Sequence, residues 1–325
     1  MEIHPLDVGN DRVMSAAYAI ECAANQRVRP GWRPLGEDAR ILGWRSGNGW
    51  TNTLLGAWDG TTLLGFAAGM TADDAADTTW IFVWVEPKYQ NAGVGSALAR
   101  AAEAASPPTA KRFVASAYRP EPAAIDALTR RFSEPMGYAA ATTETVVELD
   151  LLTAPVVASK APAGYDICTY VNGVPERCRT QVGQIKGLVD AEAPNGDLTW
   201  NETPVSPAEY AAEMALWTAQ GYTVFETLAV DSAGNVAAWT CLLAGSDAER
   251  PAQIEGTLVL GRHRGRGLGA AVKRACLKQA KETAAVEKVR TSSDDTNTWM
   301  RSINAQLGFL PVEVEVILQK ERGPR

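Results

Sequence analysis

The chain has 325 residues, of which 46% are hydrophobic and 21% charged, and its formal net charge is −7. This length fits about two domains of common size, and the acidic balance argues against nucleic acid or an anionic membrane as a partner. The chain has two histidines, His4 and His263, and five cysteines without a CxxC pair. These residues exclude a clustered-histidine site and predict neither a disulfide framework nor a zinc site, so we expect no metal.

The first residues, MEIHPLDVGNDR, lack the basic start and the apolar run of a signal peptide. No stretch of the sequence approaches the ~18 consecutive apolar residues that a membrane-spanning helix needs. We therefore expect a soluble, cytoplasmic protein.

In chain order, the first half predicts a strand, a turn and a second strand over 54–70, and an apolar strand over 80–85. A glycine-rich turn then leads into an alanine-rich helix. A later helix over 123–138 is interrupted by Pro135. The segment 151–164 follows and is rich in Ala, Pro and Ser and poor in charge, as linkers are.

The second half repeats this order. Strand, turn and strand are predicted over 227–243, an apolar strand over 254–260, and a glycine-rich turn over 261–269 that opens a helix. We therefore predict an N-terminal domain over 1–152, a linker over 153–164 and a C-terminal domain over 165–325.

The two glycine-rich turns match each other, because the residues at their heads lie 174 positions apart and later glycines keep the same offset. A second match follows the last helix of each copy, at an offset of 171. The matched residues are Gln90 with Arg264, Gly93 with Gly267, Gly95 with Gly269, and Gly137 with Gly308. Such self-similarity at a fixed offset indicates a duplicated unit.

A glycine-rich turn that opens a helix suits an anion. The first N–H groups of a helix have no partner within it, and the helix dipole adds partial positive charge there. Arg262, Arg264 and Arg266 add side-chain charge in the second copy. The spacing matches neither a nucleoside-triphosphate loop nor the three-glycine dinucleotide pattern. A plain strand–helix connection with exposed arginines is the alternative.

Gln90-Asn91-Ala92-Gly93-Val94-Gly95 and Arg264-Gly265-Arg266-Gly267-Leu268-Gly269 resemble motif A of the GCN5-related N-acetyltransferase (GNAT) superfamily. The lead-in from Val85 to Gln90 carries the family's proline, whereas the lead-in from Val259 lacks it. Residues 297–309, ending in Leu-Gly-Phe, resemble the family's late helix. The resemblance covers nearly the whole chain, twice, in a layout similar to mycothiol synthase. It implies an α/β fold of two tandem GNAT-like domains, each a mixed, mostly antiparallel sheet flanked by helices.

The resemblance also implies acetyl-CoA as co-substrate, with its pyrophosphate on the backbone amides of the turn. It places Asn297 near the pantetheine arm. The residues expected to bind the co-substrate are Leu258, Val259, Leu260, Arg264, Gly265, Arg266, Gly267, Leu268, Gly269 and Asn297 in the second copy, and Val85, Gln90, Asn91, Ala92, Gly93, Val94 and Gly95 in the first.

Glu255 stands four residues before Val259, where many members of this family have a general base. A carboxylate inside an apolar strand has a raised pKa, which suits that role; an edge-facing or ion-paired glutamate is the alternative. The first copy has Ile81 there, so we expect the C-terminal copy to be catalytic and the N-terminal copy to be degenerate. Whether the N-terminal copy holds acetyl-CoA stays open.

Asn304 is the second candidate catalytic residue, because it stands where the family often has the tyrosine that protonates the leaving thiolate. An amide is not an acid near neutral pH. Water, the ammonium product and Ser302 therefore all stay open as the proton donor.

An acidic segment lies where family members build the acceptor pocket, and it would attract a cationic amine; a solvated acidic loop is the alternative. Its carboxylates are Asp190, Glu192, Asp197 and Glu202. We predict an acyl-CoA-dependent N-acyltransferase that acetylates a primary amine of a small molecule or peptide, in natural-product tailoring or self-resistance. A non-catalytic acyl-CoA-binding or regulatory module is the alternative. We expect a monomer whose copies form an intramolecular pseudo-dimer, or a homodimer.

Overall fold

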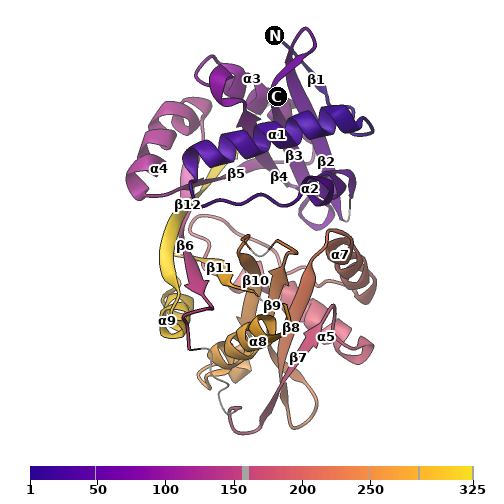
Figure 1. The fold of residues 1–325 in the computed structure, drawn as a ribbon, viewed down its shortest axis with the longest axis vertical. Coiled ribbons are helices and arrows are strands. Elements are labelled where there is room, and N and C mark those ends of the chain that lie inside the picture. The colour runs from indigo at the N-terminus through magenta and orange to yellow at the C-terminus, as the bar shows by residue number, and fades with distance from the viewer. Residues whose placement is uncertain (48, 156–160, 248, 285, 324–325) are drawn as a thin grey trace. The chain divides into compact units, whose positions relative to one another are not determined.

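The structure, a computed structural model, describes residues 1–47, 49–155, 161–247, 249–284 and 286–323. The described chain divides into unit 1, Met1–Glu144 with Glu313–Arg325, and unit 2, Thr145–Val312. Each unit contains strands of a mixed sheet with helices packed against them (Figure 1). In the described part of the chain, no helix has both the length and the apolar character to cross a membrane.

Unit 1 arranges its strands in the order β1-β2-β3-β4-β5-β12. Its described pairs are antiparallel except β4 with β5, which is parallel. The strands are β1 (Glu2–Pro5), β2 (Trp50–Asp59), β3 (Thr62–Ala72), β4 (Thr78–Val85), β5 (Arg112–Arg119) and β12 (Leu310–Glu321). The helices are α1 (Asp11–Val28), α2 (Glu37–Arg45), α3 (Val94–Ala105) and α4 (Pro122–Leu128).

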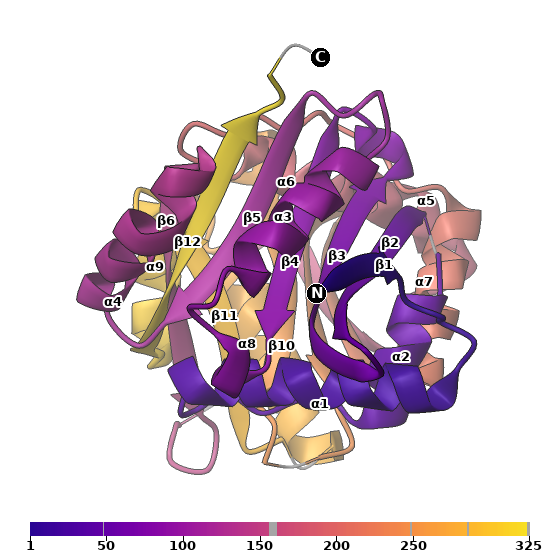
Figure 2. The same cartoon turned by 90° about the horizontal axis from the view of Figure 1, so that it is seen from above.

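Helices pack against both faces of the unit 1 strands (Figure 2). Leu98 and Ala102, one helical turn apart on α3, contact the cluster that contains Ile81. Phe66 and Trp84 point to the other face and pack with α1 and α2. This division follows from the alternation of side chains along a strand, which sends neighbouring residues to opposite faces.

Unit 2 has the order β6-β11-β10-β9-β8-β7, and the described pair β10–β11 is parallel. The strands are β6 (Ala139–Asp150), β7 (Tyr165–Val171), β8 (Thr223–Asp231), β9 (Val236–Ala244), β10 (Ala252–Val259) and β11 (Lys288–Asp294). The helices are α5 (Glu176–Lys186), α6 (Val189–Glu192), α7 (Pro207–Ala219), α8 (Leu268–Ala284) and α9 (Thr298–Leu307).

Strand β9 is the centre of unit 2, and every one of its residues is buried. Its odd and even positions face different helices. Trp239 and Cys241 pack with α5 and α7, whereas Leu242 packs with α8. Ser206 and Glu209 form a capping box that begins α7.

Each unit contains a strand from the other half of the sequence. β12 ends the chain but pairs antiparallel with β5 of unit 1, from Val314↔Arg119 to Glu321↔Arg112. The second half of β6 lies in unit 2, where Glu148 forms ion pairs with Lys288 and Arg290. Strand pairing between distant segments leaves no local pattern, which is why the predicted domain over 165–325 includes the β12 segment that the structure places in unit 1.

The predicted repeat is confirmed at the level of elements. The strand pairs expected over 54–70 and 227–243 are β2–β3 and β8–β9. The interrupted helix over 123–138 is α4, followed by a π-helical turn and a short 3₁₀ turn at Pro135. Of the predicted linker over 153–164, residues 156–160 lie outside the described residues.

Candidate active site

The glycine-rich turn of unit 2 connects β10 to α8. Gly265 and Gly267 have φ of 74° and 75°, the left-handed region that favours glycine. Residues 264–267 are exposed, and a Cβ at Gly265 or Gly267 would meet no described atom within 4 Å. Leu268 and Gly269, by contrast, are buried as α8 begins. The turn therefore offers its backbone N–H groups and the start of a helix to an anion.

Unit 1 repeats this turn with a different sequence. Asn91 has φ of 61° and Gly93 of 82°, in the same order as Gly265 and Gly267. The side chain at the head of each turn makes the same bond. Gln90 Nε2 donates to Val85 O at 3.0 Å, and in unit 2 Arg264 Nε donates to Val259 O at 3.0 Å. The head residue therefore closes the turn in both copies.

In unit 1, Ala92 is exposed, whereas Val94 is in the core at 4% exposure. A Cβ at Gly95 would lie 3.5 Å from Phe132. In unit 2, Leu258 is buried in the core and Leu260 lines a cavity. The predicted binding residues thus separate into exposed turn positions and buried positions that hold the turn in place.

The three arginines of the unit 2 turn have protein partners. Arg262 Nε donates to His263 Nε2 at 2.9 Å, and Arg266 donates to the Tyr165 hydroxyl at 3.0 Å. That hydroxyl is also bonded to His263 Nδ1 at 2.8 Å. Arg264 forms an ion pair with Glu192. His263 is buried, at 8% exposure, so its role here is to support the turn.

Parallel strands separate beside each turn. β10 and β11 pair at Ala252↔Val289 and Gln253↔Arg290 but not further along in the described registers. β4 and β5 pair in the same way, from Thr78↔Arg112 to Trp80↔Val114. Where the strands diverge beyond these pairs, a ligand with amides of its own could lie between them. An anion turn beside such a gap fits acetyl-CoA, which has a pyrophosphate and a chain with two amides.

Glu255 is the extra residue of a β-bulge. The register of β10 with β9 shifts between Ile254 and Gly256, which leaves Glu255 between them. Bulges redirect side chains and are common beside active sites. Glu255 is in contact with solvent on one side. The protein on its other sides reduces its hydration, and this loss, together with repulsion from Glu213, raises its pKa to about 7. Attraction to Lys186 and Arg250 opposes this rise.

A network of buried polar groups lies between the unit 2 strands and α7. Tyr210 donates to Glu226, and Trp239 Nε1 donates to the same carboxylate at 2.9 Å. Lys186 pairs with Glu213 and lies 4.9 Å from the Trp217 ring centre. Burial raises the pKa of Glu226. These groups surround Lys186 and Glu213, which in turn act on Glu255.

The two asparagines of α9 have different environments. Asn297 begins the helix, and its side chain accepts from Met300 N at 3.1 Å. Asn304 is 2% exposed, and its Oδ1 accepts from Lys273 Nζ at 2.7 Å. Residue 304 is therefore joined to a lysine that sequence reasoning did not single out.

Unit 1 has no bulge in the described β3–β4 register, and Ile81 is buried at 3% exposure. The Phe82 ring stacks with the rings of Trp80 and Trp84, with ring centres 6.1 and 5.9 Å apart. However, β12 places the carboxylate of Glu315 in unit 1, although the sequence did not associate this residue with the N-terminal copy. Glu315 accepts from Ser116 of β5, and burial raises its pKa to about 7.

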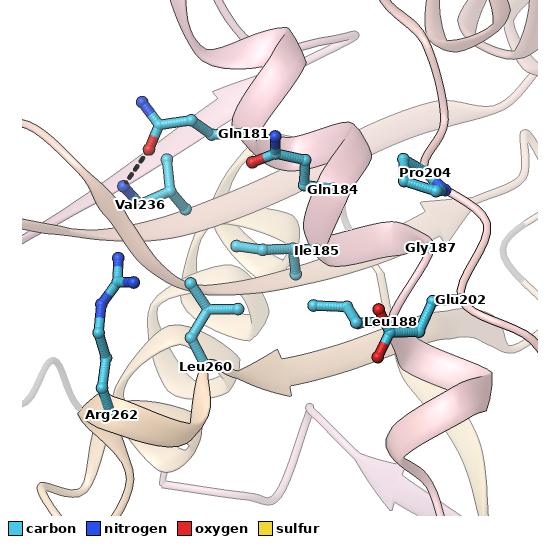
Figure 3. Close-up of a pocket in the computed structure, with 10 residues that line it drawn as sticks. All are labelled: Gln181, Gln184, Ile185, Gly187, Leu188, Glu202, Pro204, Val236, Leu260 and Arg262. Carbon is cyan, nitrogen blue, oxygen red and sulfur yellow. Dashed lines mark hydrogen bonds between the residues drawn. The ribbon is translucent and has the colours of Figure 1, made fainter.

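A cavity of about 330 Å³ lies between α5, the segment after it and the end of β10 (Figure 3). Its lining is mostly apolar, with Glu202, Gln184 and Arg262 at its walls. Its lining residues are Gln181, Gln184, Ile185, Gly187, Leu188, Glu202, Pro204, Val236, Leu260 and Arg262. Of the four acidic residues proposed for an acceptor pocket, Glu202 is the one that lines it.

A tight contact holds the cavity wall. A Cβ on Gly183 of α5 would lie 1.9 Å from Val205 O, and one on Gly187 would lie 2.2 Å from Thr203 O. The backbone confirms the close approach, because Val205 N donates to Gly183 O at 3.0 Å. Small residues at these positions let the 203–205 segment close the cavity.

The acetyltransferase (GNAT) family model matches residues 18–132 and 193–309. A tandem GNAT protein from the clavulanic acid biosynthesis pathway is 21% identical, with a TM-score of 0.81 over 100% of this chain and 99% of that one. A GCN5-related N-acetyltransferase from Sphaerobacter thermophilus is 17% identical, with a TM-score of 0.68 over 99% and 96%. No curated protein gives a significant match. Because the family model matches most of both halves, this chain belongs to the GNAT acetyltransferase family and contains two copies of its fold.

Proposed function

We propose that the protein is an acetyl-CoA-dependent N-acetyltransferase whose unit 2 acts on a primary amine of a small molecule or peptide. The observation that carries this proposal is Glu255, a carboxylate with a pKa of about 7 at a bulge of the strand that ends in the anion turn. Acetyl-CoA would supply the acetyl group as a thioester. The chain supplies the turn that holds the anion and the base that receives the proton.

Only an unprotonated amine can attack an acyl carbon, and its nitrogen must also give up a proton for the product to be a neutral amide. Glu255 can accept that proton directly or through one water. A base is most effective with a pKa near the working pH, and the shift of Glu255 brings it there. Unpaired backbone N–H groups of β10 can stabilise the developing oxyanion.

The cavity beside α5 is the proposed acceptor site. Its apolar floor suits a hydrocarbon body, and Glu202 and Gln184 can orient an ammonium or other polar group. Its volume fits a small molecule or the end of a peptide. We place this activity in tailoring of, or self-protection from, an amine-bearing natural product, which the clavulanic acid pathway of the similar tandem protein supports.

For unit 1 we propose binding of acetyl-CoA without transfer. Its turn has the same backbone conformation as the turn of unit 2, while Ile81 replaces the base. A chain in which both copies bind but neither transfers would be a regulatory module, the second candidate function.

Replacing Glu255 tests the proposal. In E255Q, kcat/KM for acetyl transfer should fall by about 10²–10⁴, because the general base is lost. On the acid side of the profile, wild-type activity should rise as the pH approaches about 7, since the carboxylate acts in its deprotonated form, and E255Q should lose this rise. Release of free CoA thiol over a panel of amines measures both.

E282Q removes an exposed carboxylate of α8 and serves as the matched control. Wild-type protein that binds acetyl-CoA but releases no thiol with any amine would support the regulatory module. An E255Q protein with wild-type rate and pH profile would remove Glu255 from the mechanism.

A further inference from the structure

Lys273 lies in the seam between α8 and α9 and is 1% exposed. Its Nζ donates to Asn304 Oδ1 at 2.7 Å and to Met300 Sδ at 3.4 Å, and lies 5.8 Å from the Phe309 ring centre. Desolvation lowers its pKa to about 7. The titratable group acting on it is Cys276 of the same helix, whose own pKa burial raises to about 12. A buried lysine without a carboxylate partner costs stability, so packing alone does not account for it.

The seam borders the gap beside the turn. A Cβ on Gly269 would lie 3.1 Å from Ile303 Cδ1 and 3.5 Å from Val259 Cγ2, so α8, α9 and the end of β10 meet at this point. Lys273 and Asn304 come one helical turn and one residue further along. A thioester arm that runs from the turn into the gap between β10 and β11 would therefore approach the two helices that carry this pair.

Asn304 has a hydrogen-bond donor, its Nδ2, that is not used within the described structure. Its Nδ2 is buried and has no hydrogen-bond partner among the described residues. Buried polar groups are normally paired, so an orphan of this kind indicates a missing acceptor. The Lys273–Asn304 pair thus has an ammonium and an amide N–H as buried donors, and Met300 shows that a sulfur atom fits against the ammonium.

We propose that Lys273, oriented by Asn304, protonates the leaving thiolate during transfer in unit 2. As the amine nitrogen bonds to the acetyl carbon, the carbon–sulfur bond breaks and sulfur keeps the electron pair. Lys273 Nζ gives that sulfur a proton and becomes a neutral amine, which solvent reprotonates. This inference rests on the proposed function. Unit 1 has Ala99 and Ser133 at the matching positions, so the site belongs to unit 2.

The first test measures binding without turnover. Affinities for CoA and desulfo-CoA are compared in wild type, K273M and the surface control K278M. Wild type and K278M should prefer CoA at pH 7, where about half of the Lys273 side chains carry a proton. The preference should fall about tenfold in K273M, the ratio that one pKa unit of thiol ionisation represents. Thiolate absorbance of bound CoA against pH should show ionisation at lower pH in wild type than in K273M.

The second test measures turnover. In K273M, kcat should fall by about 10²–10³ with KM for acetyl-CoA unchanged, and the decline of kcat above pH 7 should disappear. K273R keeps the charge but gives up no proton, so it should retain the CoA preference and lose turnover. K273A/N304Y, which supplies a phenol in place of the lysine, should recover part of the rate.

A K273M protein that keeps its CoA preference, its kcat and its pH profile would overturn the proposal and leave Lys273 a structural residue. If wild type transfers acetyl groups to no amine, but Lys273 still lowers the pH at which bound CoA ionises, the proposed function fails while the contact with sulfur stands. Thermal unfolding of each variant checks folding. K273M should be at least as stable as wild type near pH 8, because the wild-type lysine must give up its proton to be buried at that pH and methionine removes this cost.

Discussion

At the scale of single residues, Glu226 and Asn304 show two ways in which a buried polar side chain of unit 2 is paired. Glu226 is fully buried, and its two oxygens receive hydrogen bonds from Tyr210 and Trp239. The Tyr210 hydroxyl also accepts from Val174 N at 2.7 Å, so it satisfies groups on both sides. This network holds α7 and β8 together, in contrast to Asn304, whose Nδ2 has no hydrogen-bond partner among the described residues.

Y210F should lower the free energy of unfolding by about 2–3 kcal/mol, because it leaves one oxygen of the buried Glu226 carboxylate and the buried Val174 N–H without partners. Denaturant unfolding measures the loss. Y222F alters a half-buried tyrosine and should change stability by less than about 0.5 kcal/mol. Equal stability of Y210F and wild type would mean that water replaces the hydroxyl.

At the scale of elements, the strand–turn–helix unit keeps its backbone while its sequence changes. Asn91 adopts the left-handed conformation of Gly265, and Gln90 closes its turn with the bond that Arg264 makes. The chemistry of the neighbouring strand differs, because β10 has a bulge with a carboxylate and β4 has a regular register with aromatic side chains. The backbone of the turn is therefore the same in both copies, whereas the strand that leads into it differs.

Valine substitutions at the second left-handed residue of each turn, Gly267 and Gly93, test which copy transfers the acetyl group. Both substitutions strain the backbone, since φ is 75° at Gly267 and 82° at Gly93. Each also places methyl groups in open space where the anion would lie. G267V should reduce acetyl transfer at least tenfold, whereas G93V should leave it within about twofold. Calorimetry with acetyl-CoA, together with thiol release, checks both. Loss of transfer in G93V alone would assign the reaction to unit 1.

At the scale of the whole molecule, unit 1 depends on the end of the chain, because β12 pairs with its strand β5. Beyond its pairing with β5, the C-terminal segment binds α3 and the residues that follow it. Lys320 pairs with Glu103 at 2.7 Å. Arg322 donates to the carbonyls of Glu103, Ser106, Pro107 and Ala110. The last turn of α3 is thus completed by a side chain from the far end of the sequence.

A chain that ends at Val312 should lose hydrogen-exchange protection in β5 and α3, because the strand that pairs with β5 and the side chains that bind the carbonyls of α3 are removed. Protection in β8 and β9 of unit 2 should be retained. A chain that ends at Gly323 keeps β12 and is the control. Loss of protection in both units at once would show that the two fold as one cooperative body.

The sequence by itself determined the duplication, the order of elements and the anion turns, because these depend on short-range patterns of apolar residues, glycines and head residues such as Gln90 and Arg264. It also pointed to Glu255, since an acidic residue within an apolar strand can be recognised in the sequence alone. Tertiary structure alone decided where β12 pairs, that the turn arginines bind Glu192, His263 and Tyr165, and that Lys273 meets Asn304. Apart from the bond between the adjacent residues Arg262 and His263, these contacts join residues from about 30 to more than 200 positions apart, and only the packing of strands and helices brings such residues together.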